Sequence, residues 1–390
     1  MSTTTLAATA PPIAAVSRPR LFSGAVLLLF AVELAAMSSF DLLVAVVPLY
    51  ATDRGLGTAG AGLAIGVLMA ASVAAELVTP KLAARVGYRR LLVAGLVLLG
   101  APALALPAVT GVGALMAVCV ARGFGFAITV VAIATVAATA IPEQRRGEGL
   151  GVLGLMATLP AILMLPLGVW LVDRLEYPAV FALGAGCAIL AAAVASRLPE
   201  VTAGEEHVNR LFATVRRPAL LRPTVLFTAT AVASGVVIAF LPSAVDARVA
   251  VPSLFVQATT GSAARWLAGR FSDRHGAAGL LAPSIIVSAA GMGLAAFTGS
   301  GAAVVAGMAV LGVGFGTAQA ASLNTMLQRV PSAQYGAVSA AWNAGYDLGW
   351  GVGALGIGVV ASYAGYPAAF VTTACLVLAA LPLARARALD

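Results

Sequence analysis

Apolar residues recur along the whole chain in runs of about 20, a length that crosses the roughly 30 Å hydrocarbon core of a bilayer as a helix. Short loops separate the runs, and most of these loops carry charged residues. Backbone groups in lipid must bond within their own segment, which favours helices. The pattern therefore predicts twelve membrane-spanning helices, at residues 21–50, 58–79, 90–109, 112–140, 149–172, 178–198, 222–244, 250–268, 278–298, 301–327, 333–361 and 366–384.

The composition supports an all-α integral membrane protein. Of the 390 residues, 61% are hydrophobic and only 10% are charged, and the mean hydropathy is +1.00. Soluble domains carry about 25% charged residues, so a soluble protein is excluded. Cys119, Cys187 and Cys375 fall in three different predicted helices. This spacing predicts neither a disulfide framework nor a metal site, and no cofactor is expected.

The basic residues are distributed unevenly between the two sides of the predicted bundle. When the loops are assigned to alternate sides, 18 Lys and Arg residues fall on one side, and only Arg54, Arg174 and Arg248 fall on the other. Positive residues accumulate in cytoplasmic loops, so both termini are expected in the cytoplasm and the chain in the cell membrane, as a multi-pass protein. The net charge of +8 then reflects topology and contact with lipid headgroups rather than a nucleic-acid partner.

The chain contains an internal repeat at an offset of 189 residues. This shift aligns Gly123–Phe126 with Gly312–Phe315, and Tyr177 with Tyr366. Six helices in each half give the two repeats the same orientation across the membrane. Parallel repeats of this kind form one of the transporter architectures, with the substrate site between the halves near mid-membrane.

The repeat also suggests how the chain is divided. The region between the halves is the most polar stretch of the sequence and is typical of a cytoplasmic linker. The expected organisation is a disordered cytosolic tail (1–20), a first six-helix bundle (21–198), the linker (199–221), a second six-helix bundle (222–384) and a short cytosolic tail (385–390).

Two equivalent loops carry a family resemblance. The stretch Gly269-Arg270-Phe271-Ser272-Asp273-Arg274-His275-Gly276 resembles the loop signature GxxxDRxG of the major facilitator superfamily. The matching loop of the first half departs from it at Pro80 and at Ala84, where the family has Asp. In the family that Asp helps to latch the cytoplasmic side of the outward-facing state, and Ala84 lacks the carboxylate. The loop candidates are Arg85, Gly87, Arg89, Arg90, Gly269, Asp273, Arg274 and Gly276.

Two carboxylates, Glu33 and Asp41, interrupt the first apolar run. A charge at the centre of a membrane helix costs roughly 2.5–3.5 kcal/mol, so intramembrane acids are candidates for function. Eight helical residues separate the two by about 12 Å along the axis and about 80° around it, which allows them to line two levels of one cavity. Burial favours the neutral acid and a nearby Arg favours the charged form, so such a group is suited to exchanging protons.

With Arg122 in the fourth predicted helix, Glu33 and Asp41 resemble the pattern of the MdfA-type multidrug/proton antiporters. The resemblance implies that the two acids bind protons and cations and that Arg122 tunes them. In the alternative reading, Asp41 and Arg122 form a permanent structural ion pair, and Glu33 meets a backbone or hydroxyl partner.

Further polar residues lie within the predicted spans. Glu76 and Arg265 occupy equivalent repeat positions near the cytoplasmic ends and are expected to snorkel or to pair in a gate. Asp347 either lines the cavity or joins a gate. Hydrogen bonds between helices are expected for Gln257 and Gln319, with a cavity position as the alternative. The cavity candidates are Met37, Phe126, Gln257, Gln319, Trp342, Asn343, Tyr346 and Asp347.

These features predict a monomeric, proton-coupled secondary transporter that exports lipophilic or cationic small molecules by alternating access. One alternative is an exporter or proton symporter of a specific metabolite, such as a sugar or siderophore. A non-transporting membrane sensor and a membrane enzyme are the other two. The sequence has no P-loop, which argues against ATP-driven pumping, and no catalytic constellation, which argues against an enzyme.

Overall fold

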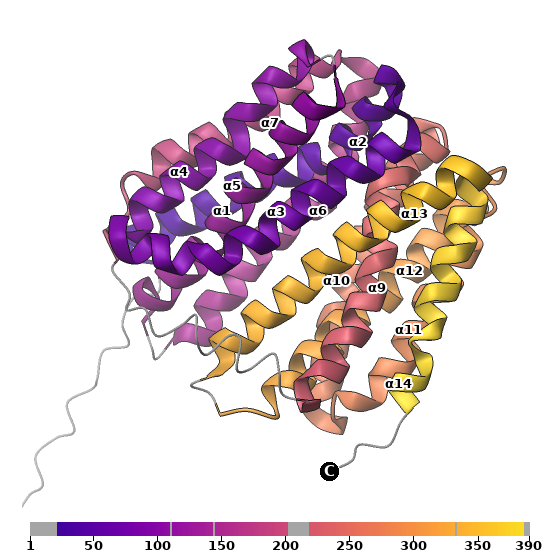
Figure 1. The fold of residues 1–390 in the computed structure, drawn as a ribbon. Helices are drawn as coiled ribbons and strands as arrows, with labels where there is room; N and C mark the ends of the chain where they lie inside the picture. The colour runs from indigo at the N-terminus through magenta and orange to yellow at the C-terminus, as the bar shows by residue number, and fades with distance from the viewer. Residues whose placement is uncertain (1–21, 110, 143–144, 202–217, 332–333, 386–390) are drawn as a thin grey trace, which may run out of the picture.

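The computed structural model describes residues 22–109, 111–142, 145–201, 218–331 and 334–385 (Figure 1). The described chain is helical, with no strand in these ranges. The first half comprises α1 (Gly24–Val44), α2 (Val46–Ala51), η1 (Thr52–Leu56), α3 (Gly57–Val86), α4 (Tyr88–Gly100), η2 (Ala101–Ala108), α5 (Val112–Ala140), α6 (Arg146–Arg174) and α7 (Tyr177–Ala195). The second half comprises α9 (Pro218–Ala244), α10 (Ala247–His275), η4 (Ala278–Leu280), α11 (Leu281–Ala295), α12 (Gly301–Leu327), α13 (Tyr335–Ala379) and α14 (Leu381–Arg385).

Nine segments of the described chain are long and apolar enough to cross a membrane. The first, Gly24–Val86, contains Gly55 and Gly57, whose φ angles are 82° and 62°. The last, Ala337–Ala384, contains Gly365, with a φ of 80°. Residues with side chains rarely adopt such angles, so glycine turns the chain where the sequence predicts a loop between two spans. The all-helical membrane fold is thus confirmed, whereas the count of twelve crossings stays a prediction.

Several boundaries differ from the expected ones. The expected tail 1–20 and most of the expected linker, residues 202–217, lie outside the described residues. The helix α9 begins at Pro218, earlier than the expected start at residue 222. The first predicted span is divided at Ala45 into α1 and α2. Pro48 has no N–H to donate to the carbonyl of Val44, which explains the break at this point.

The two halves pack against each other mainly through α3 with α13 and α6 with α10. In Figure 1 the halves are inclined to each other, and the first part of α13 runs beside α3. We call the end of the molecule that holds η1 and Gly365 the η1 end, and the end that holds Gly87 and Gly276 the linker end. Within the described residues, hydrogen bonds join the halves at the η1 end (Thr58 to Ser362, 2.8 Å) and halfway along α3, but none does so near Gly87.

Glycines allow the closest approaches between helices. A Cβ at Gly316 of α12 would overlap the carbonyl oxygen of Gly261 in α10, and a Cβ at Gly62 of α3 would overlap the carbonyl oxygen of Ala354 in α13. Small residues at helix contacts let the backbones pack tightly, which is a principal source of stability in a membrane bundle.

We expect Gly316→Ala to destabilise the protein, because the methyl group would have to push α12 away from α10. Overpacking of this kind typically costs about 1–3 kcal/mol, and more where backbone must move. Thermal unfolding in detergent should show a clearly lowered midpoint. Gly293→Ala in α11 is the matched control, because a Cβ there meets no atom within 4 Å. Equal midpoints for the two variants would contradict the packing described here.

Candidate functional site

The helix α1 carries a buried stripe of three candidate residues. Glu33, Met37 and Asp41 are 8%, 8% and 7% exposed. Residues four apart lie on one face of a helix, so the stripe runs along one side of α1. The charges of Glu33 and Asp41 act on each other, and neither side chain has a hydrogen bond or ion pair to any described residue. Two acids thus share a buried face without a permanent partner.

Arg122 of α5 is fully buried. One nitrogen, Nη1, donates to the carbonyl oxygen of Leu99 at 2.8 Å, while Nε and Nη2 have no partner among the described residues. Leaving a buried donor unpaired costs about 1–3 kcal/mol. Among the described residues, no ion pair joins Arg122 to Asp41. The permanent structural ion pair considered as an alternative in the sequence analysis is therefore absent from this conformation.

An aromatic pair joins α1 to α5. The ring of Phe40, from α1, stacks on the ring of Phe126, from α5, with centroids 4.0 Å apart and planes inclined by 17°. Phe126 is among the predicted cavity residues, but the sequence analysis did not identify Phe40. Nothing in the apolar run distinguishes Phe40 from a lipid-facing residue except its place next to Asp41.

A larger aromatic cluster lies in the second half. The rings of Phe227 (α9) and Trp342 (α13) are parallel within 4°, with centroids 4.3 Å apart. Tyr346 stacks near both Phe227 and Phe315 of α12, at centroid distances of 5.7 and 6.0 Å. The indole N–H of Trp342 donates to Ser322 Oγ at 2.9 Å, which fixes the orientation of its ring. Phe227 and Phe315 carry no signal in the sequence that separates them from core residues.

Charged groups from both halves surround this cluster. The guanidinium of Arg265 lies 5.9 Å from the ring centroid of Trp342. Arg265 is exposed to solvent. The charges of Asp41, Arg265 and Asp347 all act on the hydroxyl of Tyr346. Tyr346 therefore lies where the acids of α1 and the polar groups of the second half approach each other.

The three amide candidates do not bond between helices. Gln257, Gln319 and Asn343 are all half-buried, and their side chains have no hydrogen bond to any described residue. The interhelical hydrogen bonds expected for Gln257 and Gln319 are not seen among the described residues and stay a prediction. Buried amides that are free of protein partners are available to a ligand or to water.

Asp347 and Glu76 lie at the contact between the halves. Asp347 is 4% exposed, and its Oδ2 accepts a hydrogen bond from Ser72 of α3 at 2.6 Å. Glu76 follows Ser72 by one helical turn and is half-buried. Neither acid has an ion pair in the described chain, so the expected pairing of Glu76 in a gate is not seen in this conformation.

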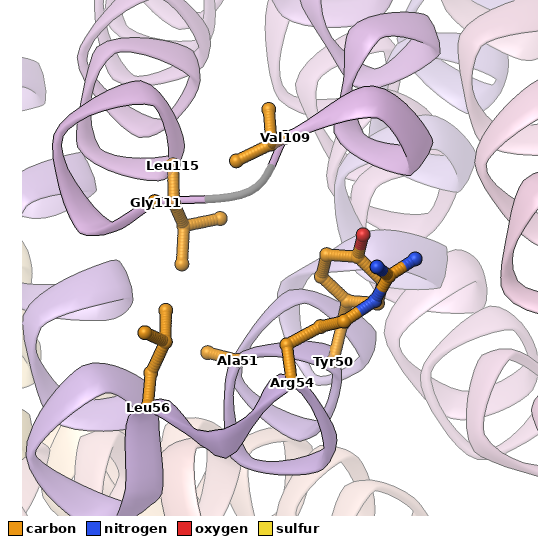
Figure 2. A pocket seen from close by; sticks show the side chains of 7 residues that line it. All are labelled: Tyr50, Ala51, Arg54, Leu56, Val109, Gly111 and Leu115. Atoms are coloured by element: carbon orange, nitrogen blue, oxygen red, sulfur yellow. The ribbon is translucent and has the colours of Figure 1, made fainter.

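One distinct pocket lies apart from these residues, at the η1 end of the first half. Its volume is about 210 Å³, and Figure 2 shows Arg54 and Tyr50 on one side of it and Leu56 and Leu115 on another. The guanidinium of Arg54 lies 4.8 Å from the ring centroid of Tyr50, whose hydroxyl donates to the carbonyl of Leu106. None of the predicted site residues lines this pocket.

Comparison with known proteins identifies the family. The family model described as Major Facilitator Superfamily matches residues 28–354 and, in a second alignment, residues 253–388. The chain belongs to the Major Facilitator Superfamily. It is therefore a multi-pass membrane protein and a transporter of small molecules rather than an enzyme. None of the curated proteins matches this sequence.

Solved structures of the superfamily share the fold. The nucleoside transporter NupG is 14% identical with a TM-score of 0.73, and the alignment covers 92% of this chain and 98% of that one. A bacterial homolog of the human lysosomal transporter Spinster is 13% identical, with a TM-score of 0.76 and coverage of 92% and 95%. The xylose transporter XylE from E. coli is 14% identical, with a TM-score of 0.69 and coverage of 92% and 97%. At these identities the likeness concerns the fold alone.

The superfamily loop motifs occupy equivalent places. Gly87 and Gly276 end α3 and α10 with φ angles of 87° and 85°, which explains why both loops require glycine. Arg89 contacts the segment that follows α7, through an ion pair with Glu200 at 3.4 Å and a bond to the carbonyl of Leu198. Arg85, Arg90 and Arg274 are exposed, Gly269 is half-buried, and the side chain of Asp273 lies outside the described part.

Proposed function

We propose that this chain is a proton-coupled antiporter that exports lipophilic or cationic small molecules. The observation that carries the proposal is the pair of acids in α1. Glu33 and Asp41 are buried, have no ionic or hydrogen-bond partner in the described chain, and retain 8% and 7% exposure. Acids in a membrane span are expensive to keep, and acids without a structural partner are free to bind a proton or a cation.

The pattern of Glu33, Asp41 and Arg122 resembles the MdfA-type drug/proton antiporters, and the geometry supports similar roles. In the proposed cycle the acids lose protons toward the cytoplasm and attract the substrate. After the halves rock, protons from outside displace it. Two nitrogens of Arg122 have no partner among the described residues, so this cation can stabilise a deprotonated acid when the helices shift.

The aromatic residues support a lipophilic substrate. The stacked pair of Phe40 and Phe126 joins α1, the helix that carries Asp41, to α5. The charge of Asp41 also acts on Tyr346, which belongs to the second aromatic cluster. Flat apolar rings next to an acid suit a cation that carries aromatic groups, because the ring faces and the carboxylate both attract positive charge.

A specific metabolite is the second candidate substrate. Arg265 is exposed to solvent, and the amides of Gln257, Gln319 and Asn343 have no hydrogen bond to any described residue. Such groups suit the hydroxyls or an anionic group of a polar solute. NupG is described as a nucleoside transporter and XylE as a xylose transporter, so the same fold accommodates polar solutes in other proteins.

The charge distribution supports cytoplasmic termini and thus a cytoplasmic linker end. With that orientation, the bond between Thr58 and Ser362 joins the halves on the extracellular side. The conformation described here then corresponds to the part of the cycle in which the substrate site communicates with the cytoplasm.

The test is a transport assay in inside-out proteoliposomes that enclose DNA and have an acidic lumen. We expect ethidium to accumulate, seen as increased fluorescence, and each addition of ethidium to release protons, seen with a pH-sensitive dye. Protein-free vesicles are the control for passive entry. Accumulation of radiolabelled xylose or uridine in place of ethidium would overturn the drug-export proposal and support the metabolite transporter. Ethidium uptake without proton release would overturn the coupling.

A further inference from the structure

We propose that Asp347, together with Glu76, forms a second proton-binding site at the contact between the halves, separate from the acids of α1. A proton bound there stabilises the contact of α3 with α13. The proposal rests on the chain being a proton-coupled transporter, as proposed above, and it deepens that function by adding a site that links proton binding to the position of the halves.

The first argument is the burial of a carboxylate across an interface. Asp347 of α13 is 4% exposed and accepts its hydrogen bond from Ser72, which belongs to the other half. This bond of 2.6 Å joins α13 to the middle of α3, halfway between the ends of α3 at Gly57 and Val86. It therefore exists only while α3 and α13 are in contact at this level, so the surroundings of Asp347 depend on conformation.

The second argument is the charge around Asp347. Glu76 lies one turn from Ser72 on the same face of α3, and its charge and that of Asp347 act on each other. Two carboxylates that share a buried site cannot both be ionised cheaply, and one of them keeps a proton. No basic side chain forms an ion pair with either acid in the described part of the chain.

The remaining neighbours do not supply a counter-ion. Arg265 of α10 approaches Tyr346 and Trp342, and Asp41 of α1 adds a further negative charge near Tyr346. The helices α11 and α12 also pack on α13 and contain no titratable residue, and the described part of α9 contains only Arg222. Arg222 donates to the carbonyls of Leu383 and Ala384 and is engaged there.

The consequence follows from linkage. A proton that binds more tightly when the halves are in contact stabilises that contact by the same factor. Raising the pH removes the proton, leaves two charges facing each other, and favours conformations in which α3 and α13 separate at this level. For one linked proton the ratio of the two conformations changes by at most about tenfold per pH unit.

The experiment measures conformation without any substrate. Spin labels at Leu82 of α3 and Phe271 of α10, both exposed and related by the repeat, report the separation of the linker ends by double electron–electron resonance. Cys119, Cys187 and Cys375 are replaced by Ala so that only the two introduced cysteines are labelled. Distances are recorded in detergent at pH 6, 7, 8 and 9.

At pH 6 we expect the distance distribution to be dominated by the conformation in which α3 and α13 are in contact. In the labelled parent protein the population of this conformation should decline several-fold by pH 9. In Glu76→Gln/Asp347→Asn the change should fall below twofold, because the amide oxygen still accepts the Ser72 bond but no proton can leave. Glu33→Gln/Asp41→Asn should retain the pH response that Asp347 supplies. An unchanged response in Glu76→Gln/Asp347→Asn, or a complete loss in Glu33→Gln/Asp41→Asn, would overturn the proposal. A failed transport assay would leave this measurement intact, so the two failures are distinguishable.

Discussion

We expect Asp41→Asn to abolish substrate accumulation driven by a proton gradient. Asp41 is buried, and no described residue forms an ion pair with it. Asn retains the size and polarity of the side chain but cannot release or bind the proton. If one proton exchanges for one monovalent cation, a gradient of one pH unit supports about tenfold accumulation, because one pH unit corresponds to about 1.4 kcal/mol. In the variant this ratio should fall to one.

Two companion variants sharpen this test in the ethidium assay. Glu33→Gln should reduce the coupled flux by removing the second acid of the same helix face. Met37→Leu is the matched control, because it keeps a similar apolar volume at the position between the acids and should retain nearly full flux. Gradient-driven accumulation that survives in Asp41→Asn at the parent level would remove Asp41 from the coupling path.

The acids were predictable because charge inside an apolar run has no ordinary explanation. Glu33 and Asp41 differ from their neighbours in the high free-energy cost of placing a charge in a membrane helix. The internal repeat of the sequence aligns Gly87 with Gly276. In the structure both acids are buried and both glycines end their helices with positive φ. A carboxylate in a membrane span and a glycine with positive φ are both predictable because few positions in a membrane protein require them.

Other features of the site could not be predicted. Phe40, Ser72 and Phe227 are ordinary residues of membrane helices, and only the packing of distant helices gives them their contacts. The same reason applies to Gln257 and Gln319, because a polar side chain in a span bonds to another helix only if a partner lies opposite it. A single sequence shows which residue is present at a position but not which residues pack against it in the fold.

The hydrophobic pattern also could not predict where the helices begin and end. The run that predicts a span at 250–268 belongs to α10, which extends from Ala247 to His275. Backbone hydrogen bonds continue into polar residues as long as the dihedral angles permit, whereas hydropathy changes at the edge of the bilayer. Gly55 and Gly365, with φ angles of 82° and 80°, lie where the pattern predicts loops between spans.

We expect a disulfide between Thr58→Cys and Ser362→Cys to stop transport reversibly. The hydroxyls of Thr58, in α3, and Ser362, in α13, are 2.8 Å apart at the η1 end. Two sulfur atoms in these places have only a short way to move to the bonding distance of about 2.05 Å. The cross-link ties the two halves together on one side of the bilayer, and alternating access requires the halves to rock against each other.

The measurement compares ethidium accumulation before and after oxidation, in a background in which the three native cysteines are replaced by Ala. Mass spectrometry of unreduced peptides establishes that the bond has formed. Flux should fall to the level of protein-free vesicles after oxidation and return on reduction, and each single-cysteine variant should be insensitive to the oxidant. A cross-linked protein that still accumulates ethidium at the parent rate would show that the η1 end does not open during transport. The movement would then have to occur elsewhere, and the contact between Ser72 and Asp347 would be the next place at which to restrain the two halves.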